Sequence, residues 1–125
     1  MKLLLDTHIL YWALYDRTRQ PAMAVKLILE ADAVFVSAAT LWEIAIKIRI
    51  GKLKGSIDEM IANLEPAGFY ELEVRSLHAA QAARLPLHHA DPFDRMLVAQ
   101  AMSESMYLLT VDKKLSQYSD LVIRV

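Results

Sequence analysis

Cysteine is absent from the 125-residue sequence. This absence excludes disulfide bonds, thiolate metal sites and a cysteine nucleophile, so any metal ion must bind oxygen or imidazole ligands. The sequence also lacks a run of about 18 uninterrupted apolar residues, which a membrane-spanning helix needs. The opening MKLLLD reaches an acidic residue before the apolar core of a signal peptide could develop. We therefore expect a soluble, cytoplasmic protein that has no membrane partner.

The balance of charges gives no clue to the partner, because a net charge of −1 can conceal a local basic stripe. The length suits one domain spanning residues 1–125, and no repeat, low-complexity tract or linker interrupts it. The hydrophobic fraction of 55% is typical of a sheet that helices cover on both faces. We therefore expect a single domain with a thick core.

Short runs rich in Leu, Val, Ile and Tyr alternate with longer stretches of helical period. The runs predict five strands, at residues 2–5, 33–37, 69–74, 107–111 and 121–125. Alternating strands and helices indicate an α/β fold, namely a three-layer α/β/α sandwich with a central, mostly parallel five-stranded sheet. Such sheets bind ligands beyond the carboxyl ends of their strands, at the topological switch point.

The limits of several helices can be read from single residues. Ser56 followed by Glu59 predicts a capping box, and Asp91 before a proline predicts a helix start. Gly51 and Gly68 predict helix ends.

Four acidic residues lie where this fold would bring them towards one edge of the sheet. Asp6 follows the first strand and Asp112 follows the fourth. Glu43 lies in the apolar helix after the second strand, and Asp94 lies on the apolar side of a late helix. Three of them have an ordinary alternative: Asp6 and Asp112 suit helix N-caps, and Glu43 suits an ion pair with Lys47.

Four carboxylates at one edge would repel one another without a cation. Oxygen ligands without neighbouring His or Cys favour Mg²⁺ or Mn²⁺ and argue against Zn²⁺. The four histidines are scattered, and none has the spacing that makes a zinc site with another His. Such a cation activates water and offsets charge on a phosphate, so the acids indicate hydrolysis of a phosphodiester.

The blocks LLLDTHILYW, SAATLWEIAIKIRIGKL, HHADPFDRMLVAQA and LLTVDKKL, taken in order, resemble the motifs of PIN-domain ribonucleases, closest to the VapC-type toxins. By this resemblance, the metal-binding and catalytic acids are Asp6, Glu43, Asp94 and Asp112. Asp91 is similar to an accompanying acid, which we take first as a helix cap and second as an outer-shell residue. Thr110 stands where the family often has a Ser or Thr near the metal, although a strand position equally favours threonine.

The resemblance implies an endoribonuclease that depends on Mg²⁺ or Mn²⁺ and cuts single-stranded or looped RNA. It also implies the toxin half of a toxin–antitoxin module, a homodimer that a cognate antitoxin silences. A non-catalytic partner-binding domain on the same fold is the alternative, because a fold alone does not fix activity. An aspartyl phosphatase is disfavoured because the run DTH lacks a second Asp. A phosphorelay receiver is disfavoured because no adjacent acidic pair stands near the start.

Basic residues cluster beside the helix that carries Glu43. They suit the phosphates of an RNA backbone, as does a further arginine beside Asp94, and the set is Lys47, Arg49, Lys52, Lys54 and Arg95. Solvated charges that stabilise a helix C-terminus are the ordinary alternative for the first four.

Overall fold

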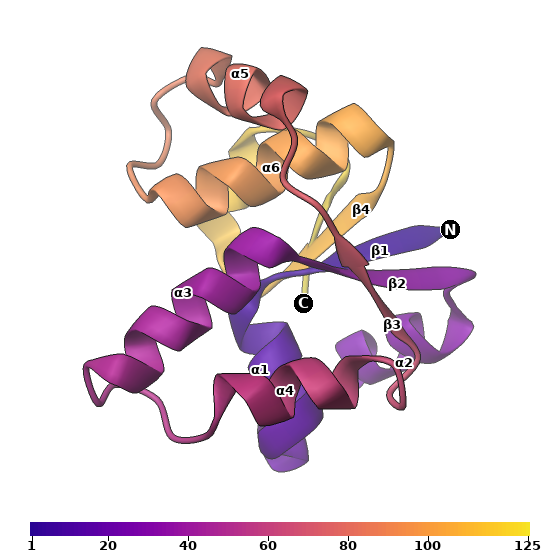
Figure 1. Ribbon diagram of the computed structural model, residues 1–125. Coiled ribbons are helices and arrows are strands. Elements are labelled where there is room, and N and C mark those ends of the chain that lie inside the picture. The colour runs from indigo at the N-terminus through magenta and orange to yellow at the C-terminus, as the bar shows by residue number, and fades with distance from the viewer.

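A five-stranded parallel sheet forms the centre of the molecule, in a computed structural model that describes residues 1–125 (Figure 1). The strands are β1 (Lys2–Leu5), β2 (Ala33–Ser37), β3 (Phe69–Leu72), β4 (Tyr107–Thr110) and β5 (Val122–Arg124). They lie in the order β3-β2-β1-β4-β5, and every neighbouring pair is parallel. The predicted α/β class and the five-stranded sheet are therefore confirmed.

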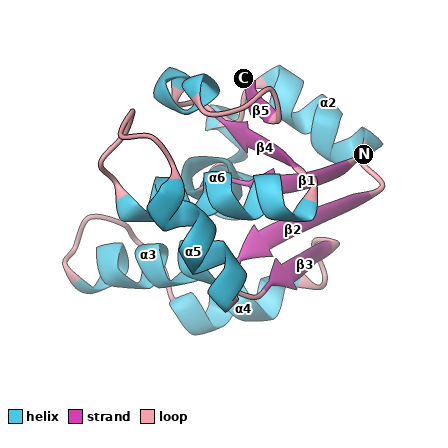
Figure 2. Cartoon of the chain, turned by 90° about the horizontal axis from the view of Figure 1, so that it is seen from above, coloured by secondary structure: helices cyan, strands magenta, loops and turns pink.

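Helices cover both faces of this sheet. They are α1 (Thr7–Tyr15), α2 (Ala22–Glu30), α3 (Ala38–Arg49), α4 (Ile57–Leu64), α5 (Ser76–Arg84) and α6 (Pro92–Glu104), with short 3₁₀ helices η1 (Arg17–Arg19) and η2 (Lys113–Gln117). In Figures 1 and 2, α5 and α6 lie over one face of the sheet, and α1, α2 and α4 lie on the opposite side. No helix is long and apolar enough to cross a membrane.

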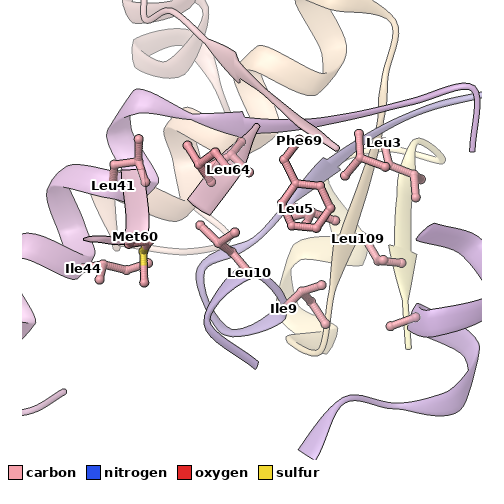
Figure 3. Close-up of a cluster of buried hydrophobic side chains, with 13 residues drawn as sticks. Leu3, Leu5, Ile9, Leu10, Leu41, Ile44, Met60, Leu64, Phe69 and Leu109 are labelled. Atoms are coloured by element: carbon pink, nitrogen blue, oxygen red, sulfur yellow. The ribbon is translucent and has the colours of Figure 1, made fainter. Parts of the chain in front are cut away.

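Alternating side chains of the central strand divide the core between the two faces. Leu3 and Leu5 belong to the core cluster that includes residues of α1 to α4 (Figure 3), whereas Leu4 belongs to the cluster built mainly by α6. All three are fully buried. A strand buried on both faces explains why β1 is apolar at consecutive positions, since neither face meets water.

The switch point lies beside β1. The chain passes from β1 to β2 on one side of it, and β4 returns on the other side, with Leu5 in register with Leu109. The backbone N–H of Asp6 donates to the Leu109 carbonyl at 3.0 Å, so the carboxyl ends of the two strands adjoin. The residues that follow β1 and β4 are therefore neighbours in space.

The predicted strands at residues 69–74, 107–111 and 121–125 are too long. β3 ends at Leu72 because its partner in register is Ser37, where β2 ends and α3 begins. The helix limits hold in outline: Asp91 and Ser56 are N-caps, and the left-handed backbone of Gly51 and Gly68 follows α3 and α4. Ser56 accepts from the Glu59 N–H at 3.3 Å, but Glu59 does not return the bond, so the capping box is half formed.

Candidate metal centre

An acidic cleft of about 280 Å³ opens at the carboxyl edge of the sheet. The four acids proposed from the sequence all line it, and Asp91 joins them. The full lining is Asp6, Thr7, His8, Glu43, Lys47, Asp91, Asp94, Val111 and Asp112. Residues from four separate segments of the chain therefore meet at the place where a parallel sheet binds its ligand.

Two of the acids use one oxygen as a helix cap and the other in the cleft. Asp6 Oδ1 accepts from the backbone N–H groups of His8 (2.9 Å) and Ile9 (3.3 Å), while Asp6 Oδ2 accepts from the Thr110 hydroxyl. Asp112 Oδ1 likewise caps η2, and its Oδ2 faces His89 in the cleft. Capping and site formation are therefore not alternatives, because the cap fixes the direction of the carboxylate.

Glu43 projects from α3 and is only 7% exposed. Its Oε1 accepts from the hydroxyl of Thr7 at 2.6 Å, and its Oε2 lies 2.8 Å from Lys47 Nζ. The ion pair with Lys47 is thus formed, inside the cleft. Thr7 was not foreseen, because a threonine at a helix start has no distinguishing pattern in the sequence. Together the two donors fix the carboxylate on both oxygens.

Asp94 carries a strongly perturbed carboxyl group in the cleft. Asp91 caps α6 through Oδ1, which accepts from the N–H groups of Phe93 and Asp94 itself. Burial raises the pKa of Asp94 to about 7, and the negative charges of Asp91, Asp6 and Glu43 add to this rise. Carboxylates that repel one another in a partly dry site favour the neutral form until a cation compensates them.

Asp6 shows the same tendency. Burial raises its pKa, although the hydrogen bond from Thr110 and the helix-capping bonds oppose the rise. An all-oxygen donor set with excess negative charge fits a hard divalent cation such as Mg²⁺ or Mn²⁺. Asp6, Glu43, Asp94 and Asp112 are the residues that could hold it.

A histidine takes part in this cleft, contrary to the expectation that no His lies near the acids. His89 Nε2 lies 3.0 Å from Asp94 Oδ2 and 3.3 Å from Asp112 Oδ2. These three residues form the only group of potential ligand atoms within 4.8 Å of one another. Asp6 and Glu43 face the same cleft but lie outside this tight group. The spacing between pairs of histidines gave no indication of His89, because its partners in the cleft are aspartates.

The basic residues divide into three kinds. Lys47 belongs to the cleft, whereas Arg49, Lys52 and Lys54 are exposed and form no ion pair. The guanidinium of Arg95 is engaged by backbone carbonyls, because it donates to Ala82 in the last turn of α5 (2.8 Å) and to Pro86 in the loop that follows (2.9 Å). These bonds hold the loop between α5 and α6, and the binding of RNA by Arg95 stays a prediction.

Comparison with known families decides the assignment of this fold. The model of the PIN domain matches residues 3–121. The chain belongs to the PIN-domain family. Its sheet order and its acidic cleft at the carboxyl edge are thus features of a PIN domain. No protein of curated function matches the chain in sequence.

Solved structures share this PIN fold over nearly their whole length. One is a chain of VapBC2 from Rickettsia felis bound to a DNA fragment from its promoter, with 14% identity, 100% and 98% of the two chains covered and a TM-score of 0.71. A toxin–antitoxin complex from Klebsiella pneumoniae has 16% identity, coverage of 97% and 95% and a TM-score of 0.66. VapC20 of Mycobacterium tuberculosis, a toxin that cleaves the sarcin–ricin loop, has 16% identity, coverage of 98% and 99% and a TM-score of 0.64. At these identities the likeness shows the fold.

Proposed function

We propose that this PIN domain is a metal-dependent endoribonuclease, which hydrolyses RNA phosphodiester bonds with Mg²⁺ or Mn²⁺ and acts as the toxin of a toxin–antitoxin module. One observation carries the proposal. Acids from four segments of the chain line a single cleft, where burial and, after it, the neighbouring negative charges raise the pKa of Asp94 to about 7. PIN-domain proteins are generally nucleases, and a toxin that cuts RNA is among the structural neighbours.

Residues of this chain would bind the cation and orient its ligands for the reaction. A bound divalent cation supplies an activated water and offsets the charge that develops on the phosphate. Asp6, Glu43, Asp94 and Asp112 would bind it. Thr110 and Thr7 keep the carboxylates of Asp6 and Glu43 aimed into the cleft by donating to them. Asp91 fixes the start of the helix that carries Asp94 and adds negative charge from outside the ligand set.

The substrate would be held through its phosphates. Arg49, Lys52 and Lys54 lie at the end of α3 and in the segment after it, exposed and without acidic partners. Unpaired cations of this kind bind a polyanionic backbone without reading its sequence. Lys47, which lines the cleft beside Glu43, could meet the phosphate nearest to the scissile bond.

Cleavage by the purified chain tests the proposal. The protein is incubated with a labelled RNA that has single-stranded loops, in Mg²⁺ or Mn²⁺ and then in EDTA. We expect cleavage only with the metal, and its absence from an Asp94→Asn preparation purified in parallel, which rules out a contaminating ribonuclease. A protein that binds RNA or a partner but cuts nothing under these conditions would instead be a non-catalytic domain.

An antitoxin partner suits an apolar groove that shares no residue with the acidic cleft. The groove encloses about 510 Å³ and is lined by parts of α1, α2 and α4 and by Phe69 at the start of β3. Leu29 on its rim is 80% exposed, which is unusual for a leucine without a partner. An apolar segment of the antitoxin would cover it. Co-expression with the product of a small open reading frame directly upstream tests this, and Leu29→Asp should abolish co-purification.

A second copy of the chain would pack on α3. Trp42, Ile46 and Ile50 follow one another at four-residue spacing and are 65%, 37% and 59% exposed. The spacing puts them on one face of the helix, so they form an apolar stripe that water meets in the monomer. Light scattering after gel filtration should give a dimer, and Ile46→Glu should give a monomer.

A further inference from the structure

The imidazole of His89 occupies the space between two of the proposed metal ligands. Its Nε2 lies 3.0 Å from Asp94 Oδ2 and 3.3 Å from Asp112 Oδ2. The Asp112 oxygen concerned is the one that does not cap η2. His89 therefore contacts the same oxygens that a cation would need.

Hydrogen bonding fixes which nitrogen of the ring carries the proton. The backbone N–H of Asp91 donates to His89 Nδ1 at 3.3 Å, so Nδ1 presents a lone pair. In a neutral imidazole the proton then resides on Nε2, which makes Nε2 a donor to the carboxylates. A metal ligand needs a lone pair instead, so in this tautomer Nε2 does not bind metal.

The loop that carries His89 is held in place by other residues. The backbone N–H of His89 donates to the Tyr118 hydroxyl at 2.8 Å. Arg95 donates to the carbonyls of Pro86 (2.9 Å) and Leu85 (3.0 Å). The ring itself is held only by the hydrogen bonds of Nδ1 and Nε2. Rotation of the side chain is therefore the way in which the imidazole leaves the acids, with the loop backbone fixed.

We propose that His89 competes with the divalent cation for Asp94 and Asp112, and so sets how tightly the cleft binds metal. A cation at about 2.0–2.2 Å from both oxygens would lie where the Nε2–H group points, so the cation and the imidazole cannot occupy this space together. This inference rests on the proposed metal site, and adds that His89 weakens the binding of its cation.

Calorimetric titration of the full chain with Mn²⁺ tests the competition. Removing the imidazole in His89→Ala should lower the Kd about tenfold, a change of about 1.4 kcal/mol. His89→Gln keeps an amide donor and should give a smaller decrease. His88→Ala is the matched control, because His88 is exposed in the same loop and packs on Tyr118 (ring centroids 5.1 Å apart) without touching the acids. Its Kd should equal that of the wild type.

The outcomes separate this inference from the proposed function. Weaker or unchanged Mn²⁺ binding by His89→Ala, in a protein whose binding is lost in Asp94→Asn, would overturn the competition and leave the metal site standing. Absence of Mn²⁺ binding from every variant would overturn both. If His89→Ala does not fold, ¹⁵N NMR of the wild-type imidazole decides the question. The proton should stay on Nε2 at saturating Mg²⁺, and its transfer to Nδ1, as in a metal-bound ring, would overturn the proposal.

Discussion

The hydroxyl of Thr110 links the ends of the two central strands, because it donates to Asp6 Oδ2 and accepts from the backbone N–H of Asp112 at 3.0 Å. Thr110 is fully buried, and Asp6 is 4% exposed. One hydroxyl therefore fixes the positions of two proposed metal ligands that are separated by more than a hundred residues in the chain.

Replacing this hydroxyl by a methyl group tests its positioning role. Thr110→Val keeps the volume and removes a donor to Asp6, so the pKa of Asp6 should rise further and the cation should bind less tightly. Loss of such an outer-shell partner typically costs about 10–100-fold in metal affinity or activity. We expect a decrease of this size in kcat/KM for RNA cleavage. Thr18→Val, an equal change at an exposed site bonded to Asp16, should leave cleavage unaltered.

The raised pKa of Asp94 makes stability depend on pH when metal is removed by EDTA. Between about pH 4 and 7 the folded protein keeps a proton on Asp94 that the unfolded chain has released, so the free energy of unfolding should fall as pH rises through this window. Each pH unit contributes at most about 1.4 kcal/mol, and less here because solvent reaches the side chain.

Urea unfolding at several pH values checks this expectation. Asp94→Asn should reduce the slope, leaving the part that Asp6 contributes through its own raised pKa, and should be more stable than the wild type by about 2 kcal/mol at pH 8. The control Asp120→Asn changes an exposed acid away from the cleft and should keep the wild-type slope. A wild-type stability that rises from pH 4 to 7 and runs parallel to that of Asp94→Asn would contradict the assigned pKa.

The salt dependence of RNA binding tests the basic surface beyond α3. Each cation that neutralises a phosphate of single-stranded RNA contributes about 0.7 to the slope of log K against log salt. Arg49→Ala and Lys52→Ala should each reduce the slope by about this amount, measured by fluorescence anisotropy in EDTA to prevent cleavage. Lys26→Ala removes an exposed charge on α2 and should not change the slope. Equal slopes in all four proteins would place the RNA elsewhere.

Arg95 should matter for stability, because its guanidinium bonds the loop before α6. Arg95→Met keeps the apolar stem and leaves several carbonyls without their charged donor. We expect a loss of about 2–3 kcal/mol in the free energy of unfolding, as hydrogen bonds to charged groups contribute about 1.5–3 kcal/mol. Arg84→Met, at the exposed end of α5, should lose less than about 0.5 kcal/mol. Equal stabilities in urea would refute the role of Arg95.

The sequence predicted the features that depend on period and order. The apolar runs placed all five strands, and alternation with helices implied a parallel sheet, which in turn placed Asp6 and Asp112 at one edge. Strand ends were less predictable. Glu73 and Val74 continue the alternation of polar and apolar residues in β3 but have no neighbour in β2 to pair with, because β2 has already become α3.

The contacts that refine the site were not predictable, because they depend on loops and on single hydroxyl groups. His89 lies on a segment without helical or strand period, and only the bonds made by Arg95 and Tyr118 bring it to the acids. Thr7 and Glu43 are 36 residues apart, and no local pattern connects them. The basic pattern likewise did not distinguish Arg95, which serves the loop, from Arg49, which is exposed.

Crystals of the wild-type protein soaked in Mn²⁺ show whether the acidic cleft binds a divalent cation, since the anomalous signal locates the ion without reference to activity. We expect a peak in the cleft at about 2.1–2.2 Å from oxygens of Asp94 and Asp112, with Asp6 and Glu43 around it directly or through water. Peaks only outside the cleft, or none at a Mn²⁺ concentration that supports RNA cleavage, would contradict it.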